Sequence, residues 1–302
     1  MSLKYSSNFE FISKVVDHYD KLKYALLDAQ TFNPDTYGFP NFYYKVMETD
    51  QLRVDAFRNA FKKYRGMKNK VVCEIGIGTL ALTKHYLDDV KKAYLIESNP
   101  NVIPLVKKML KKNGWDKKVV LIHGDALKTE LPEKVDFIIG ELMSVFCANE
   151  YQVQIFKHMR QFLKPKGKLI PGKIVNLAQL SYADFDKEHK HYPIFFTRHL
   201  PEQFTPQKVV NTIDLYKEKK MNIVRKTKFT PLLSGTINSV YIHSYIEVAE
   251  GCNFTGTDSL MPPTVVKLKR AVKVKAGVPV VLHSDYTYGT SLDEAVFSVK
   301  KV

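Results

Sequence analysis

Short apolar runs alternate with amphipathic helical patterns through the middle of the chain, and this alternation predicts the fold. The apolar runs fall at residues 71–75, 93–96, 119–122, 135–139 and 168–170. Apolar residues at helical spacing occupy the intervals, at residues 80–90, 102–112 and 151–162. Buried strands that alternate with helices in this way indicate a doubly wound parallel α/β sheet of the Rossmann-like kind.

Both flanks of this region have a different pattern. Apolar residues that recur every three or four positions predict an amphipathic helix over residues 9–27. After a turn-rich break, the same pattern predicts a second helix over 43–64. After residue 184 the helical patterns thin out, and the runs at 240–248, 265–274 and 278–286 alternate or extend like strands. We therefore expect an amino-terminal helical segment over 1–70, a Rossmann-like domain over 71–183 and a mostly β domain over 184–302.

The composition is that of a globular protein with an excess of basic residues. The 302 residues include 46 Lys and Arg against 31 Asp and Glu, which gives a net charge of +15. This excess favours acidic partners such as nucleic acid, although lysine pairs at helical spacing, as at residues 107–112, are also typical of solvated helix faces. No apolar run has the length of a signal peptide or a membrane span, so we expect a cytoplasmic protein without a membrane partner.

Cysteine and histidine usage predicts no metal site. The cysteines are scattered and lack the spacing of a zinc site or a disulfide framework, and we expect Cys147 to fill apolar space. Three histidines lie close together along the chain, namely His189, His191 and His199. Their spacing is irregular, so we expect solvated or locally bonded side chains rather than metal ligands.

A glycine-containing loop follows the first apolar run. Gly76 and Gly78, between Glu74 and Thr79, would let the backbone approach a ligand closely, while a plain strand–helix turn is the alternative interpretation. The second apolar run ends in Glu97, about twenty residues on, where a carboxylate can accept hydrogen bonds from ribose hydroxyls. The third run is followed by Asp125 and Ala126, which are well placed for an adenine edge.

The loop favours S-adenosyl-L-methionine over a dinucleotide. A dinucleotide fingerprint has a third glycine, whereas this chain has Ala81 at that position. Glu74 also precedes the loop, and a carboxylate suits a ligand with sulfonium and ammonium charges better than one with phosphates. We therefore expect Glu74, Gly76, Gly78 and Thr79 to bind the methyl donor.

Two carboxylates, Glu141 and Glu150, lie nine residues apart directly after the apolar run at 135–139. Ligands of open α/β sheets bind outside the carboxyl ends of the strands, so this pair can bracket a cation there. The alternatives are that Glu141 holds loop amides and that Glu150 stabilises the start of a helix.

Over residues 43–299 the chain resembles the protein arginine methyltransferases. The most specific match is the family's double-glutamate loop, which has the same separation after the same strand and places Glu141 and Glu150. The segment from Met47 to Arg53 resembles the family helix in which the arginine holds the carboxylate of the cofactor. The family's second domain is a β-barrel, so the resemblance implies a barrel-like carboxyl-terminal domain.

The resemblance also implies an activity. Glu141 and Glu150 would clamp a guanidinium, which is protonated near neutral pH, and draw its charge away from the nitrogen that receives the methyl group. The implied acceptor is protein arginine, and a homodimer is compatible with the family's dimerisation arm near residues 184–208. Met47 and Arg53 join the expected cofactor site, while the alternative for Arg53 is a surface helix arginine paired with Asp50, one turn earlier.

The chain departs from the family pattern on the acceptor side. The family's Thr-His-Trp is replaced by Thr264-Val265-Val266, so Asp50 lacks the histidine partner that the family provides and has no evident partner in the sequence. Three alternatives therefore stay open. They are a methyltransferase of a small-molecule amine or guanidine, a methyltransferase of RNA, and a non-catalytic scaffold.

Overall fold

The computed structural model describes residues 48, 50–194, 200–255 and 261–301. The chain divides into two compact units, residues 1–37 and 38–302, and all described residues belong to the second unit. The helix predicted over 9–27 lies outside the described residues. No helix in the described part of the chain is long and apolar enough to cross a membrane.

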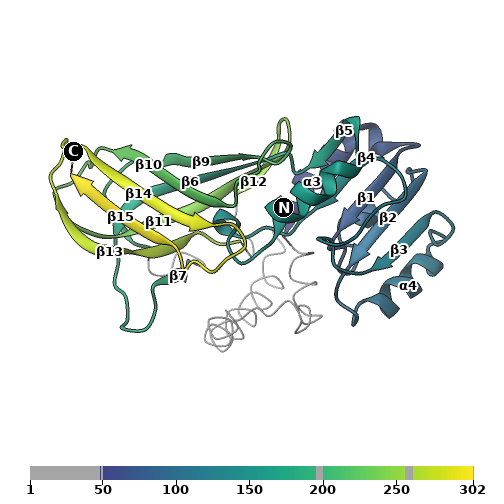
Figure 1. Ribbon diagram of the computed structural model, residues 1–302, viewed down its shortest axis with the longest axis horizontal. Helices are drawn as coiled ribbons and strands as arrows, with labels where there is room; N and C mark the ends of the chain where they lie inside the picture. Colours follow the sequence, from purple (N-terminus) through teal and green to yellow (C-terminus); the bar gives the residue numbers. More distant parts are fainter. Residues whose placement is uncertain (1–47, 49, 195–199, 256–260, 302) are drawn as a thin grey trace, which may run out of the picture. The chain divides into compact units, whose positions relative to one another are not determined.

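A parallel sheet of five strands forms the first half of the described chain and confirms the predicted α/β fold. Its strands are β1 (Val71–Ile75), β2 (Lys92–Glu97), β3 (Val119–His123), β4 (Val135–Gly140) and β5 (Leu163–Ile170). They pair in the order β3-β2-β1-β4-β5, at the right of Figure 1. Every residue of the central β1 is buried, as expected for a strand covered on both faces.

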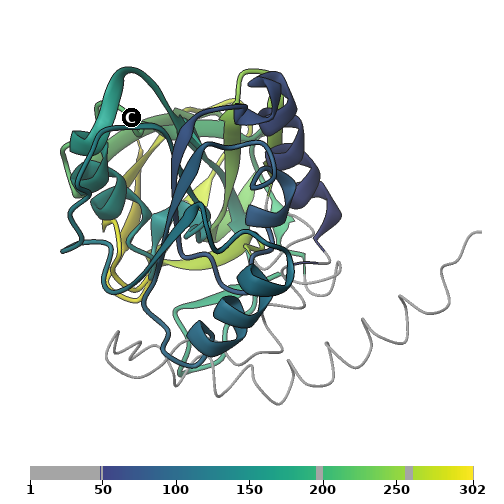
Figure 2. The same cartoon turned by 90° about the vertical axis from the view of Figure 1, so that its right-hand side faces the viewer.

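Three α-helices flank these strands, as Figure 2 shows from the side of the parallel sheet. They are α3 (Gln51–Lys63), α4 (Ile103–Lys112) and α5 (Gln152–Met159). Asp50 caps α3 by accepting a hydrogen bond from the backbone N–H of Arg53. Single 3-10 turns complete the region, at η1 (Arg65–Met67), η2 (Thr83–His85), η3 (Val145–Cys147) and η4 (Arg160–Phe162).

The helix predicted over residues 80–90 is wrong as a regular α-helix, because this segment contains only η2 and turns. Leu80 has a left-handed φ of 67°, which interrupts helix formation at its start. The hydroxyls of Thr83 and Tyr86 then donate to the buried Glu74 carboxylate, which fixes the turns against β1. The apolar spacing is real, since Leu80 and Leu87 are fully buried.

Antiparallel strands form the second half, at the left of Figure 1, and confirm the predicted β domain. They are β6 (Lys173–Tyr182), β7 (His191–Pro193), β8 (Glu202–Gln203), β9 (Lys208–Asp214), β10 (Asn222–Phe229), β11 (Gly235–Ala249), β12 (Cys252–Thr255), β13 (Thr264–Val274), β14 (Val280–Thr287) and β15 (Val296–Lys301). The larger sheet has the order β7-β13-β11-β6-β8, with β12 on β11 and β9 on β6. The smaller sheet has the order β10-β14-β15.

The two antiparallel sheets adjoin each other, since β13 lies beside β15 and β9 beside β10. Inward-facing side chains such as Ile242 and Leu282 are fully buried between them. The parallel pairing ends with β5 at Ile170, and antiparallel pairing begins with β6 at Lys173. The division of the chain into domains at residues 183–184 stays a prediction.

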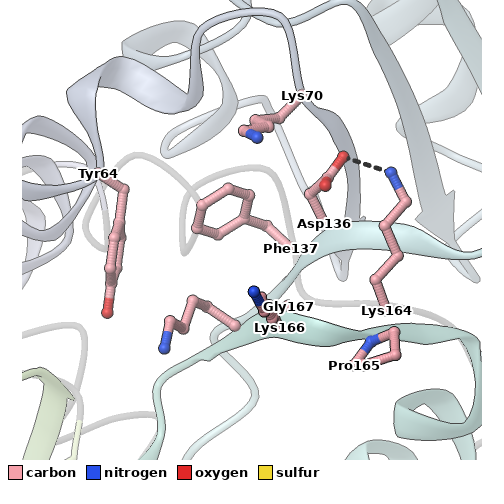
Figure 3. Close-up of a pocket in the computed structure, with 9 residues that line it drawn as sticks. Tyr64, Lys70, Asp136, Phe137, Lys164, Pro165, Lys166 and Gly167 are labelled. Atoms are coloured by element: carbon pink, nitrogen blue, oxygen red, sulfur yellow. Dashed lines mark hydrogen bonds and ion pairs between the residues drawn. The ribbon is translucent and has the colours of Figure 1, made fainter.

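One carboxylate joins the amino ends of three parallel strands. Asp136 Oδ2 accepts hydrogen bonds from the backbone N–H of Val71 at 2.9 Å and from Lys164 Nζ at 2.8 Å, and Figure 3 shows the contact with Lys164. Burial alone would raise the pKa of Asp136, but Lys164 and the Val71 amide outweigh it, so the pKa is lowered. The ionised side chain therefore stabilises the register of β1, β4 and β5.

We predict that Asp136→Ala lowers the free energy of unfolding by about 1–3 kcal/mol at neutral pH, because it leaves a backbone N–H without its acceptor. A depressed carboxyl pKa stabilises the fold above the unfolded-state pKa and loses this effect as the pH falls, so the difference from wild type should shrink below about pH 4. Urea unfolding at several pH values measures it. The control is Asp116→Ala on an exposed turn, and equal losses in both variants would contradict the role.

Candidate functional site

The predicted site residues gather at the carboxyl ends of the parallel strands. Glu97 ends β2, and its two carboxylate oxygens accept the backbone N–H of Gly78 at 2.9 Å and of Asn99 at 2.8 Å. The Gly124 N–H donates to the Glu97 carbonyl at 3.0 Å, which brings the segment after β3 to the same place. The glycine loop, the β2 carboxylate and the β3 turn are thus hydrogen-bonded together.

The glycine loop needs its glycines. Gly76 and Gly78 have φ values of +68° and +48°, in the left-handed region. A Cβ atom added to Gly76 would lie 2.5 Å from Leu142 Cδ2. The loop after β1 therefore packs directly against the residue that follows Glu141.

Two predicted residues of this loop have partners within the protein. Glu74 is buried, and it accepts a hydrogen bond from Thr83 Oγ1 at 2.7 Å and another from the Tyr86 hydroxyl. Burial raises the pKa of Glu74 to about 7, although both hydroxyls oppose the shift. Thr79 Oγ1 donates to Glu48 Oε1 at 2.6 Å. The Glu74 carboxylate thus sits among protein hydroxyls beneath the loop.

Of the two predicted residues after β3, Asp125 is exposed and Ala126 is not. Asp125 Oδ1 accepts the Leu127 N–H at 2.8 Å, Lys128 Nζ lies 3.8 Å from Asp125 Oδ2, and the Asp125 side chain is 44% exposed. Ala126 is buried. Met47, which the sequence also assigned to the site, lies outside the described residues.

A partly buried ion pair joins α3 to the loop after β4. Arg53, 5% exposed, donates from Nη1 to Glu141 Oε2 at 3.0 Å. Asp50 Oδ2 lies 3.6 Å from Arg53 Nε, and Asp50 Oδ1 accepts the Arg53 N–H at 3.2 Å. The expectation that Asp50 has no evident partner is therefore wrong, because Asp50 accepts the backbone N–H of Arg53 and also pairs with the Arg53 guanidinium.

Glu150 belongs to the same electrostatic cluster. Burial raises its pKa to about 8, the negative charge of Glu141 adds to the shift, and Arg53 opposes it. Burial also raises the pKa of Glu141, with Arg53 again opposing. Two carboxylates thus share a poorly hydrated place with one guanidinium, which leaves an excess of acceptor groups for a further cation.

The loop between the two glutamates is held in an unusual conformation. Phe146, Cys147 and Asn149 have φ values of 59°, 54° and 61°, which non-glycine residues seldom adopt. The β half holds them there: the Phe146 N–H donates to Ser244 Oγ on β11 at 2.9 Å, and the Asn149 N–H donates to the carbonyl of Thr290, in the loop after β14, at 3.0 Å. Such strain persists only where surrounding contacts over-determine it.

Further hydrogen bonds fix both ends of this loop. The Leu142 N–H donates to Gln152 Oε1 at 2.8 Å, and Gln152 Nε2 donates to the Gly140 carbonyl at 3.3 Å. The Gly289 N–H donates to the Cys147 carbonyl at 2.8 Å. The sequence analysis missed Gln152, although its position two residues after Glu150 could have indicated a role in the loop. It also missed Ser244, because nothing in the sequence of β11 marks this serine as a partner of the loop.

The remaining candidates have structural partners. His189 Nδ1 lies 2.6 Å from Asp186 Oδ2, and His191 Nδ1 lies 3.1 Å from Asp293 Oδ1. Within the described ranges no group of His, Cys, Asp or Glu could hold a metal ion; His199 lies outside them. Cys147 is buried, and burial raises its pKa, which agrees with its expected role as a small apolar side chain.

A pocket of about 460 Å³ lies at the opposite ends of the strands. Figure 3 shows Tyr64, Lys70, Phe137 and Lys166 around it, beside Asp136 at the start of β4. Because Glu141 follows the other end of β4, this pocket is separate from the candidate site.

The chain is similar to known methyltransferases. The model of the family described as PRMT5 arginine-N-methyltransferase matches residues 17–170, just over half of the chain. The uncharacterized protein MJ1452 of Methanocaldococcus jannaschii is 26% identical over 236 residues, which are 77% of this chain and 88% of that protein. The histone-arginine methyltransferase CARMER of Aedes aegypti is 28% identical over 139 residues. This match covers 45% of the chain but only 23% of that relative.

A solved structure shows the same fold. It is the PRMT1 enzyme-prozyme complex of Trypanosoma brucei with AdoHcy, with a TM-score of 0.69 and 18% identity. The match covers 80% of this chain and 86% of that chain. Both halves of the described chain therefore correspond in fold to a known methyltransferase structure.

We predict that Ser244→Ala lowers the free energy of unfolding by about 1–3 kcal/mol, because the Phe146 N–H and Asn176 Oδ1 both lose a buried hydrogen bond to Ser244 Oγ. Amide exchange at Phe146 should also become faster. Urea unfolding and hydrogen exchange measure these effects. Ser298→Ala on β15, whose side chain makes no hydrogen bond among the described residues, is the control. A loop that exchanges as slowly as in wild type would contradict the role of Ser244.

Proposed function

The chain belongs to the PRMT5 arginine-N-methyltransferase family, and from this membership we propose that it transfers a methyl group from S-adenosyl-L-methionine to a guanidinium nitrogen of protein arginine. The observation that carries the proposal is the half-buried pair Glu141 and Glu150, which has more negative than positive charge around it. Such a pair suits a cationic acceptor.

The residues at the strand ends fit the proposed cofactor. Gly76 and Gly78 have backbone conformations that suit glycine, so a ligand can come close to the loop. Each oxygen of Glu97 accepts one backbone N–H, and a carboxylate oxygen has a further lone pair for a ribose hydroxyl. The cofactor would supply an electrophilic methyl group there. Asp125 and Ala126 would lie at its adenine. Glu74, held by Thr83 and Tyr86, would support the glycine loop, and Thr79 would bind the cofactor as part of that loop.

Arg53 would connect the cofactor and acceptor sites. Its guanidinium has several N–H donors in a fixed plane, so it can bind Glu141 and the carboxylate of the cofactor together. By fixing Glu141 at 3.0 Å, Arg53 orients one arm of the clamp before the acceptor enters. The resemblance of the segment from Met47 to Arg53 to the family helix supports this assignment.

The clamp would act in two ways. Carboxylates that hold two edges of a planar guanidinium fix its orientation, and most of the rate gain in a displacement reaction comes from such positioning. They also draw positive charge toward the nitrogens that they contact, which leaves more electron density on the third. Glu150, with a pKa of about 8, is suited to accept the proton that the guanidinium loses.

We predict that Glu150→Gln and Glu141→Gln each lower methyl transfer to an arginine-rich peptide by at least about a hundredfold, since each removes one ionisable carboxyl group of the clamp. Radiolabel transfer from S-adenosyl-L-methionine measures the rate, and calorimetry of cofactor binding is the control, because Glu150→Gln should bind the cofactor as wild type does. A wild-type protein that binds the cofactor but methylates no peptide would contradict the proposed acceptor. A protein that binds no cofactor would indicate a scaffold.

We also predict that Glu150→Gln stabilises the protein at alkaline pH. Because the folded-state pKa of about 8 is above the reference value of 4.5, the contribution of Glu150 to stability is present below the reference value and is lost as the pH rises through 8. Glutamine avoids the buried charge, so the variant should gain on the order of 1–3 kcal/mol over wild type near pH 9 and less near pH 6. Urea unfolding measures the gain, with exposed Glu130→Gln as control. An equal gain at both pH values would contradict the assignment.

A further inference from the structure

The basic residues of the β half occur in segments that lack carboxylates. The sequence has no Asp or Glu between residues 219 and 246, between 259 and 284, or between 295 and 302. The same segments contain a dozen Lys and Arg residues, so they account for most of the net charge of +15. The charge excess of the protein is therefore concentrated in these segments and not spread over all its helix faces.

These segments lie side by side in the fold. They form β10, β14, β15 and β13, which are consecutive neighbours in the wall of the β half (Figure 1). In the smaller sheet, Lys228 is in register with Val281, which pairs with Lys300, and Lys226 is in register with His283. Alternate residues share a face, and since Thr227, Leu282 and Val299 face the core, the lysines face outward.

The neighbouring strand β13 extends the basic surface. Its register shifts between the partners of Ile237 and Ser239, so residues 268–271 bulge from the ladder. Lys269 and Arg270 in this bulge are exposed. We call Lys226, Lys228, Lys269, Arg270, Lys273 and Lys300 the basic band. The carboxylate of Asp285 on β14 marks one border of it.

The basic band is not neutralised by the protein. Lysines elsewhere are paired, for example Lys92 with Glu133 at 2.9 Å and Lys173 with Glu247 at 2.6 Å. Among the residues that the structure describes, no member of the basic band forms an ion pair with a carboxylate. Burial lowers the pKa of His283 on β14, and the charges of Lys300 and Lys226 on the two neighbouring strands lower it further, as expected in a positive potential.

We propose that the basic band binds the phosphate backbone of nucleic acid without regard to sequence. Lys228 and Lys300 lie on either side of Val281, about 10 Å apart across β14. With the cations of the neighbouring β13 they form a track for a polyanion. The aromatic side chains of these strands, such as Phe229, Tyr286 and Phe297, are buried, so base stacking adds nothing to the contact. This proposal does not depend on methyl transfer.

The shape of the surface favours nucleic acid over a membrane. The strands curve around a shared core, so the cations lie on a convex wall, whereas a lipid bilayer offers a plane. On these strands the exposed apolar side chains Val224 and Val296 are in register with Asp285, at the border of the band. The exposed Leu232, Leu233 and Val278 lie on loops beyond the strands. A membrane would need these loops, and a phosphate backbone on the band would not.

The test measures binding of the full-length protein to a fluorescent mixed-sequence DNA duplex and to its single strand, without cofactor, across a salt series. Wild type should bind both, with affinity that falls steeply with salt. The variant Lys226→Glu/Lys228→Glu/Lys300→Glu should bind at least about tenfold more weakly at low salt. The slope of log affinity against log salt concentration should be smaller in magnitude by about two to three, as three lost phosphate contacts require.

The matched control, Lys107→Glu/Lys108→Glu/Lys111→Glu, makes the same change of charge on the exposed face of α4. It should keep affinity and slope within about twofold of wild type. Equal loss in both variants, or no binding by wild type at low salt, would overturn the proposal. The proposal would also be overturned if the protein bound vesicles of anionic lipid but not DNA, and if the variant Leu232→Ser/Leu233→Ser lost this vesicle binding. If the glutamate variant does not fold, the Lys→Gln triple variant should show the same smaller slope.

Discussion

The placement of the half-buried Glu141 and Glu150 beside a single guanidinium is the constraint on which the candidate site depends. Loss of hydration raises the pKa of Glu150, and the like charge of Glu141 adds to this cost. Arg53 offsets part of it from α3. The rest must be offset by rigid surroundings, and the loop between the glutamates has them. Its amides are bonded by Gln152, by Ser244 of β11 and by Thr290.

Because Ser244 and Thr290 belong to the antiparallel half, the loop is built by both halves of the described chain. The α/β sheet supplies the carboxylates, and the β half supplies the acceptors that keep Phe146 and Asn149 in left-handed conformations. Neither half alone would hold the glutamates in this arrangement. The β half thus has a structural role at the site in addition to any contact with an acceptor.

Sequence reasoning succeeded where one physical signal dominated. The buried strands β1, β2 and β4 were predicted because a strand covered on both faces must be apolar. The role of the glutamate pair, which rests on its spacing, stays a prediction. Reasoning failed where contacts distant in sequence decide the outcome. Residues 80–90 have helical spacing, yet Leu80 turns left-handed and two hydroxyls bind Glu74. The spacing of Asp50 and Arg53 did predict their pairing as an alternative, but the burial of Arg53 against Glu141 depends on a contact 88 residues away.

The contact between Gly76 and Leu142 joins the two loops in a way that also bears on how the sequence can change. The Leu142 side chain fills the space that any Cβ at position 76 would need. Positions 76 and 142 therefore share one volume, although 66 residues separate them along the chain. A side chain at 76 would need both a left-handed backbone and a displaced Leu142, so the shape of the cofactor loop and that of the glutamate loop depend on each other through a single methyl group.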